Sequence, residues 1–195
     1  MKPLISCLAA AAALALAGEA RAAVSVMGGG FAEACAHAAR TGLVTNKTED
    51  ICTAALDGEL LTARDRAGTY VNRGIIKLRA KAYDAAIADF NTAIRYKSDL
   101  AEAYVNRGAA RIGVRHYAES IADLTQALDL AVPEPEKAYY NRAVAYEWLD
   151  NEKAAYFDYK KAIELAPDWD LPKDQLTRFT VSHANFSAPG ASPNL

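Results

Sequence analysis

The chain has 195 residues, of which 52% are hydrophobic and 24% are charged, and its 22 basic and 24 acidic side chains give a net charge of −2. This composition fits one ordinary globular domain and excludes a collagen-like or disordered chain. A pI near 5.9 argues against a nucleic-acid-binding protein, which would carry a basic stripe.

Residues 1–22 are predicted to be an export signal. Lys2 supplies the positive start, residues 4–17 form an apolar run, and residues 20–22 read Ala-Arg-Ala, a small-x-small cleavage pattern. The apolar run of about 14 residues is too short for a membrane-spanning helix, which needs about 20. We therefore expect cleavage before Ala23, no membrane span in the mature chain, and a location in the periplasm of a Gram-negative bacterium.

Residues 23–66 are predicted to form a helical hairpin. Its first helix is expected over residues 31–40 and its second over residues 49–60, joined by a polar connection that contains Gly42. The second helix echoes the alanine-rich pattern found further along the chain, so this hairpin is expected to be a degenerate copy of the units that follow.

An internal repeat organises residues 67–169. The run Tyr-Val-Asn-Arg-Gly at residues 70–74 recurs 34 residues later at 104–108, and a related run follows 35 residues after that at 139–143. Apolar residues at three- and four-residue spacing indicate helices throughout. A period of this length predicts stacked helical hairpins, each unable to bury its own apolar face alone.

Within each unit the residues resemble a tetratricopeptide repeat. A small residue in the first helix is followed by a large apolar residue in the alanine-rich second helix; these residues pair as Gly74 with Phe90, Gly108 with Leu124, and Ala143 with Tyr159. Pro167 closes the third unit as prolines do in that family. The resemblance implies an all-α fold, a right-handed α-solenoid of antiparallel helix pairs with full repeats at residues 67–100, 101–135 and 136–169.

The C-terminal part is predicted to end the stack. Residues 170–181 are expected to form a capping helix that covers the last repeat. Residues 182–195 are rich in Ser, Pro, Gly and Asn and are expected to be a disordered tail.

Cys35 and Cys52 are the two cysteines that remain after the predicted cleavage. Aligning Ala55 with Ala93 places them on facing positions of the two helices of the degenerate hairpin. In an oxidising compartment such a pair is expected to form a disulfide.

Each full repeat carries an arginine in its first helix and an aspartate 16 residues later in its second: Arg73 with Asp89, Arg107 with Asp123, and Arg142 with Asp158. A catalytic relay has no reason to appear three times in register. We therefore predict structural ion pairs that bridge the two helices and specify their register more than they add stability.

Catalytic and metal chemistry finds little support. Cys35 and His37, two residues apart on a helix, point about 200° apart and cannot form a nucleophile–base pair. A metal site built on these residues and Cys52 lacks a fourth ligand. We therefore expect a protein that is not an enzyme and has no bound metal and no cofactor.

The resemblance implies a peptide-binding groove lined by the first helices on the concave wall of the solenoid. Carried over by position, its residues are Val71, Asn72, Ile75, Val105, Asn106, Ala109, Lys137, Tyr140, Asn141 and Val144. The three asparagines can donate to and accept from an extended peptide backbone. They could instead hydrogen-bond within the solenoid and hold adjacent repeats, and the sequence leaves both open.

The sequence therefore predicts a non-catalytic module that binds a peptide or helical segment of another protein. It is expected to be a monomer or weak oligomer. The alternative is a structural or self-associating component of a periplasmic or envelope assembly, with contacts through the solenoid edges.

Overall fold

The computed structural model describes residues 23–26, 30–42 and 45–179, and this part of the chain contains α-helices and no strand. The predicted export signal and the predicted tail lie outside the described residues. The helices are α2 (Phe31–Thr41), α3 (Asn46–Gly58), α4 (Ala63–Arg79), α5 (Tyr83–Tyr96), α6 (Ala101–Gly113), α7 (Tyr117–Asp129), α8 (Pro135–Trp148), α9 (Glu152–Leu165) and α10 (Asp170–Leu176).

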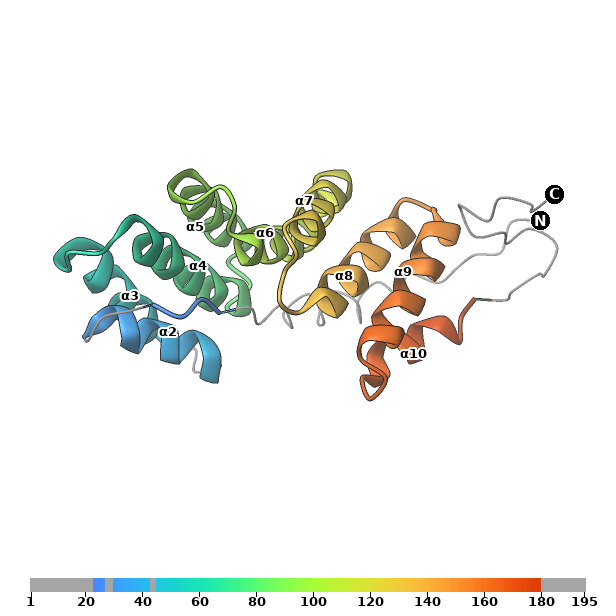
Figure 1. Ribbon diagram of the computed structural model, residues 1–195, viewed down its shortest axis with the longest axis horizontal. Coiled ribbons are helices and arrows are strands. Elements are labelled where there is room, and N and C mark those ends of the chain that lie inside the picture. The colour runs from blue at the N-terminus through green and yellow to red at the C-terminus, as the bar shows by residue number, and fades with distance from the viewer. Residues whose placement is uncertain (1–22, 27–29, 43–44, 180–195) are drawn as a thin grey trace.

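The helices stack as antiparallel pairs into an elongated solenoid (Figure 1). The pairs are α2–α3, α4–α5, α6–α7 and α8–α9, and α10 packs against α9. First helices also contact one another, because α4 packs against both α2 and α6, and α6 packs against α8. The all-α solenoid predicted from the repeat is confirmed.

Within a hairpin the two helices approach closely at a residue without a side chain. A Cβ atom on Gly74 would lie 2.5 Å from the Phe90 ring, and one on Gly108 would lie 2.7 Å from Leu124 Cγ. Phe90 and Leu124 are fully buried. The pairing of a small residue with a large apolar one, expected from the sequence, therefore forms the contact between the two helices.

Four turns between the described helices use a left-handed backbone residue other than glycine, whereas the end of α2 uses Gly42. Lys81, Arg115 and Asp150 lie within hairpins and Ala131 lies between two, with φ values of 60°, 64°, 56° and 54°. The left-handed region costs an L-residue about 1–2 kcal/mol. Backbone bonds from the residues that follow close each turn, as from the Ala82 N–H to the Lys77 carbonyl at 2.9 Å. The hydrogen-bonded helix ends therefore hold these residues in the left-handed region.

A disulfide joins the two helices of the N-terminal hairpin. Cys35 in α2 and Cys52 in α3 have Cα atoms 4.9 Å apart, and both side chains are fully buried beside Ile76 of α4. Helix α3 begins at a capping box in which Thr45 and Thr48 exchange side-chain to backbone hydrogen bonds. The hairpin is thus linked internally and packed on the first repeat.

The C-terminal helix α10 is shorter than the range 170–181 expected for a cap. It ends at Leu176, and residues 177–179 continue as a turn. Leu171, Leu176 and Phe179 pack against the cluster of buried residues in α8 and α9. They occupy the face that a further repeat would otherwise cover.

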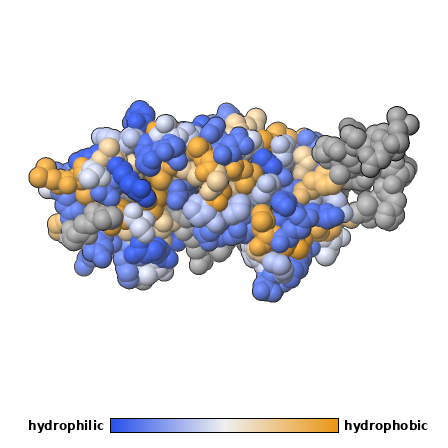
Figure 2. Space-filling view, viewed as in Figure 1, coloured by the Kyte–Doolittle hydropathy of each residue, from blue (hydrophilic) through white to orange (hydrophobic). Residues whose placement is uncertain are grey.

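The surface is mixed in character. Figure 2 shows hydrophobic residues in separate patches among hydrophilic ones on the face in view. Phe31 and Leu60 are among the large apolar residues that are exposed. Within the described part of the chain, every helix is too short or too polar to cross a bilayer.

We predict that reducing the Cys35–Cys52 disulfide lowers the free energy of unfolding by about 3 kcal/mol, because the bond restricts a loop of about 18 residues in the unfolded chain. Urea unfolding with and without reductant measures the difference, and the Cys35→Ala/Cys52→Ala variant should match the reduced protein. Peptide mapping without reduction should link the two cysteines. Alkylation of both cysteines in the unreduced protein would contradict the bond.

Candidate functional site

Asn72, Asn106 and Asn141 occupy equivalent positions in the first helices α4, α6 and α8, and all three are buried. Asn72 binds a backbone in both directions: its Oδ1 accepts from the Val24 N–H at 3.0 Å, and its Nδ2 donates to the Val24 carbonyl at 2.9 Å. The Nδ2 of Asn106 donates to the Glu102 carbonyl of its own helix at 2.7 Å. The Asn141 side chain makes no hydrogen bond to another described residue. Asn72 therefore binds the backbone of an earlier segment of the same chain, whereas Asn106 bonds to its own helix.

The backbone that Asn72 holds belongs to residues 23–26, which run without helical structure along α2 and α4 (Figure 1). Val24 and Val26 are buried, whereas Ser25 between them is exposed. This alternation is the pattern of an extended strand. Val24 joins the core that includes Ala67 and Val71 of α4, and Val26 joins a smaller cluster with alanines of α2 and α3.

Gly68 makes the room for this segment. A Cβ atom on Gly68 would lie 2.8 Å from Val24 Cγ1 and 3.3 Å from Val26 Cγ2. The repeat spacing of 34 and then 35 residues places Glu102 and Lys137 at the same position of α6 and α8. Of these three helices, α4 alone lacks a side chain there. Sequence reasoning missed this site, although a glycine in place of a charged residue was its signal.

The apolar residues expected to line the groove lie in the core of the solenoid. Val71, Ile75, Val105 and Ala109 are fully or almost fully buried in the core between adjacent hairpins. The reason is that the first helices pack side by side, so residues four apart on α4 or α6 face a neighbouring helix. These four side chains are therefore part of the core beneath the surface of the first helices.

The groove residues expected in α8 are also mostly interior. Tyr140, Asn141 and Val144 are at most 3% exposed, whereas Lys137 is half-buried and its Nζ lies 2.5 Å from Glu134 Oε1. The Tyr140 hydroxyl is buried and has no hydrogen-bond partner among the described residues. A peptide-binding role for these residues stays a prediction.

The arginine–aspartate pairs form in all three repeats. Each guanidinium donates two parallel hydrogen bonds to its carboxylate; the distances are 2.9 and 2.7 Å for Arg73 and Asp89, 2.8 and 2.6 Å for Arg107 and Asp123, and 2.7 and 2.9 Å for Arg142 and Asp158. Burial disfavours the charge on Arg73, but the hydrogen bonds and charge of Asp89 outweigh it and raise the pKa of Arg73. The same balance with Asp158 raises the pKa of Arg142.

Sequence reasoning missed a second hydrogen-bond partner of each arginine. Every guanidinium also donates to a polar side chain in the second helix of the preceding hairpin: Arg73 to Thr53 at 3.0 Å, Arg107 to Asn91 at 2.6 Å, and Arg142 to Thr125 at 3.0 Å. Each arginine also lies over the ring of the tyrosine three residues before it, 5.3 to 5.4 Å from the centroid. The pairs therefore connect neighbouring repeats as well as the two helices of one repeat.

The aspartates differ in how many cations surround them. Lys77 also approaches Asp89 at 2.8 Å, and Arg111 approaches Asp123 at 2.6 Å. Tyr146 holds the equivalent position in the third repeat, so Asp158 has one cationic partner within the described part of the chain. The third repeat is therefore the simplest place to measure one pair.

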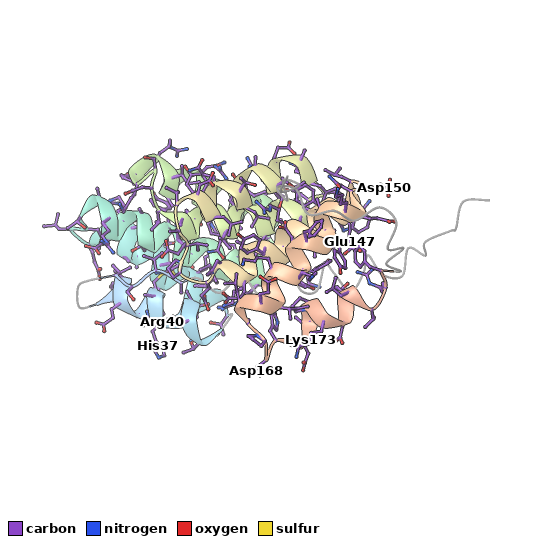
Figure 3. The ribbon with its side chains drawn as sticks, turned by 45° about the vertical axis from the view of Figure 1, so that its right-hand side comes forward. His37, Arg40, Glu147, Asp150, Asp168 and Lys173 are labelled. Atoms are coloured by element: carbon purple, nitrogen blue, oxygen red, sulfur yellow. A yellow bond between two sulfur atoms is a disulfide. The ribbon has the colours of Figure 1, made fainter. Side chains whose placement is uncertain are left out.

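The remaining candidate chemical groups are separated. Cys35 and Cys52 are bonded to each other, and Figure 3 shows His37 and Arg40 projecting outward from α2. No group of three or more metal-ligating side chains occurs within the described ranges.

A partly exposed polar cluster joins the last repeat to the C-terminal turn. Tyr159 donates to Glu147 Oε2 at 2.5 Å, and Arg178 pairs with Glu147 at 3.0 Å. Burial raises the pKa of Tyr159, and the charge of Glu147 and their hydrogen bond add to this effect. Burial likewise raises the pKa of Tyr140, whose ring packs against Trp169. Both phenols are therefore neutral at ordinary pH, and the cluster is a structural contact.

Comparison with known families and structures places this fold. Residues 67–100 and 136–168 each match a model of the tetratricopeptide repeat. Comparison of the sequence with curated proteins finds no match. The two matched segments are the first and third of the repeats found from the sequence period.

Solved structures with this architecture are similar over most of the solenoid. The TPR domain of Arabidopsis OM64 is 25% identical, with a TM-score of 0.58 over 60% of this chain and 96% of that one. The MamA RS-1 ArsTM double mutant is 18% identical, with a TM-score of 0.62 over 75% and 79% of the chains. MamA 41-end from Desulfovibrio magneticus RS-1 is 21% identical, with a TM-score of 0.57 over 72% and 75%. The likeness to MamA shows the fold alone.

We predict that Asp158→Ala destabilises the protein by about 2–4 kcal/mol, because it leaves the partly buried Arg142 without a countercharge. The double variant Arg142→Met/Asp158→Leu is expected to cost less than the single one. Urea unfolding of the two variants measures this comparison. A double variant less stable than Asp158→Ala would mean that the pair itself supplies net stability.

Proposed function

We propose that this protein, an α-solenoid that carries tetratricopeptide repeats, is a non-catalytic interaction module that holds an extended segment of another protein on its concave surface. The repeats and their structural neighbours support a role in binding protein. The proposed surface is formed by the first helices α4, α6 and α8.

The observation that carries the proposal is the pair of hydrogen bonds between Asn72 and the backbone of Val24. An amide side chain that both accepts and donates satisfies the two polar groups of one extended residue, whatever its side chain is. The repeat period places Asn106 and Asn141 at the same position on the next two helices. Recognition of a backbone can therefore extend along the stack.

The third repeat offers hydrogen-bonding groups for such a partner. Tyr140 and Asn141 are consecutive residues of α8, and neither the Tyr140 hydroxyl nor the Asn141 amide makes a hydrogen bond to another described residue. Buried polar groups are normally paired, so a ligand that supplies the missing partners gains free energy. Lys137, one turn earlier, adds a positive charge beside them.

Export is part of the same proposal. Residues 1–22 have the pattern of a signal peptide, and the Cys35–Cys52 disulfide suits an oxidising compartment such as the periplasm. A partner would then be another exported protein or the exposed part of an envelope protein.

Affinity capture from periplasmic extract, followed by mass spectrometry, identifies the partner, and variants then test the surface. We predict that Asn141→Ala lowers binding of that partner about fivefold, since one hydrogen bond contributes about 1 kcal/mol. Lys137→Ala tests the neighbouring charge, and Lys153→Ala, an exposed lysine on α9, is the matched control.

Unchanged binding by both folded variants would contradict the proposed surface. Light scattering on the same samples separates a monomer that captures a partner from a chain that assembles through the edges of its solenoid. An assembly that forms without a partner would support the structural alternative.

A further inference from the structure

We propose that the groove between α2 and α4 is a recognition site for an extended segment with small β-branched side chains at alternate positions, and that residues 23–26 occupy it in cis in competition with a partner segment. This inference deepens the proposed function and rests on it only for access of a second segment. The occupation in cis is testable by itself.

Recognition of the backbone is concentrated at one residue. The Val24 N–H and carbonyl both bond to Asn72, at 3.0 and 2.9 Å, and these atoms are buried. The hydrogen bonds do not depend on the identity of the Val24 side chain. A segment from another chain, once extended in the same way, can make the same two bonds.

Selectivity comes from the surfaces on either side of that residue. Val24 and Val26 point inward and Ser25 points outward, so the groove contacts every second side chain. A Cβ atom on Gly68 would lie 2.8 Å from Val24 Cγ1 and 3.3 Å from Val26 Cγ2, so the two valines already fill the space beside this residue. The inward positions of a ligand are therefore expected to accept Val or Thr and to reject charged or aromatic residues.

The helices around the groove also contact the two valines with small side chains. Val26 packs with small residues from the N-terminal hairpin, namely Ala32, Ala36 and Ala55. Val24 packs in the core that contains Ala39, Ala67 and Val71. Small side chains on both walls bring the segment close enough to α4 for its backbone to reach Asn72.

Residues 23–26 already occupy the groove, so they determine how tightly a partner segment must bind in order to displace them. A tethered segment has an effective concentration of about 1 mM when its linker is short. A free peptide that binds the empty groove with a Kd of about 100 μM would then bind the occupied groove about tenfold more weakly. Displacement therefore requires a partner of matching chemistry or high local concentration.

Hydrogen exchange tests the occupation in cis on the purified protein. The Val24 amide is expected to be protected in the native chain and to lose this protection in Gly68→Ala, whose added methyl group meets the side chains of Val24 and Val26 as its nearest neighbours. Gly58→Ala is the matched control, because a Cβ there meets nothing within 4 Å. An unprotected Val24 amide in the native chain overturns the inference.

Peptide binding tests recognition in trans. The probe is a fluorescent peptide with the sequence of residues 23–28, and its control carries Asp in place of both valines. Val24→Asp, which loosens the resident segment, is expected to bind the probe about tenfold more tightly than the native chain. Adding Gly68→Ala to that variant is expected to abolish the gain.

The outcomes separate this inference from the proposed function. Equal probe binding by the native chain and by a folded Val24→Asp variant overturns the competition, as does a gain that survives Gly68→Ala. The effect of Asn141→Ala on the captured partner is measured independently, so either result can fail without the other. Circular dichroism melting shows that each variant is folded.

Discussion

The solenoid depends on a partly buried arginine that occurs once in each repeat. A guanidinium partly removed from water must find partners for its charge and its N–H groups, and here it finds hydrogen-bond partners on two other helices. The first helix supplies Arg107, the second helix of the same hairpin supplies Asp123, and the preceding hairpin supplies Asn91. The guanidinium group is planar, so the directions of its N–H bonds are fixed. The arginine therefore sets how far one hairpin is rotated relative to the next.

This constraint determines what the concave surface can present. The first helices are held side by side, so their large apolar residues are covered by neighbouring helices and become the core. Polar groups beside these residues, and gaps left by missing side chains, remain to contact a ligand. Asn72 and Gly68 combine both features on adjacent turns of α4, and there the structure holds an extended segment.

The fold and the ion pairs could be predicted because their signals are periodic. A shift of 34 or 35 residues superposes each repeat on the next, so a pairing inferred for Arg73 and Asp89 was available two more times. The site that holds residues 23–26 has no such signal. Val24 lies 48 positions before Asn72, and the segment of four residues does not recur in the sequence. Partners such as Thr53 were missed because they lie across a repeat boundary.

The burial of the expected groove was missed for a related reason. An apolar residue on the inner face of a repeat helix packs either on a ligand or on the next helix, and the sequence pattern is the same in both cases. The spacing between hairpins decides whether such a residue packs on a ligand or on the next helix. That spacing is set by small residues such as Ala109 and by the hydrogen bonds that each arginine makes to the preceding hairpin.

The disulfide bears on the same groove. Val26 packs against alanines of both α2 and α3, so the shape of the groove around it depends on how these two short helices are held together. The Cys35–Cys52 bond fixes their relative position before any segment binds, which lowers the ordering cost of binding.

A repeat at the end of a solenoid has a neighbour on one side only. In this protein the covalent link and the inserted valines together take the place of the missing neighbour, so that removing the segment would expose the apolar interior of the first hairpin. A ligand that displaces it must therefore bury the same two positions with side chains of the same size.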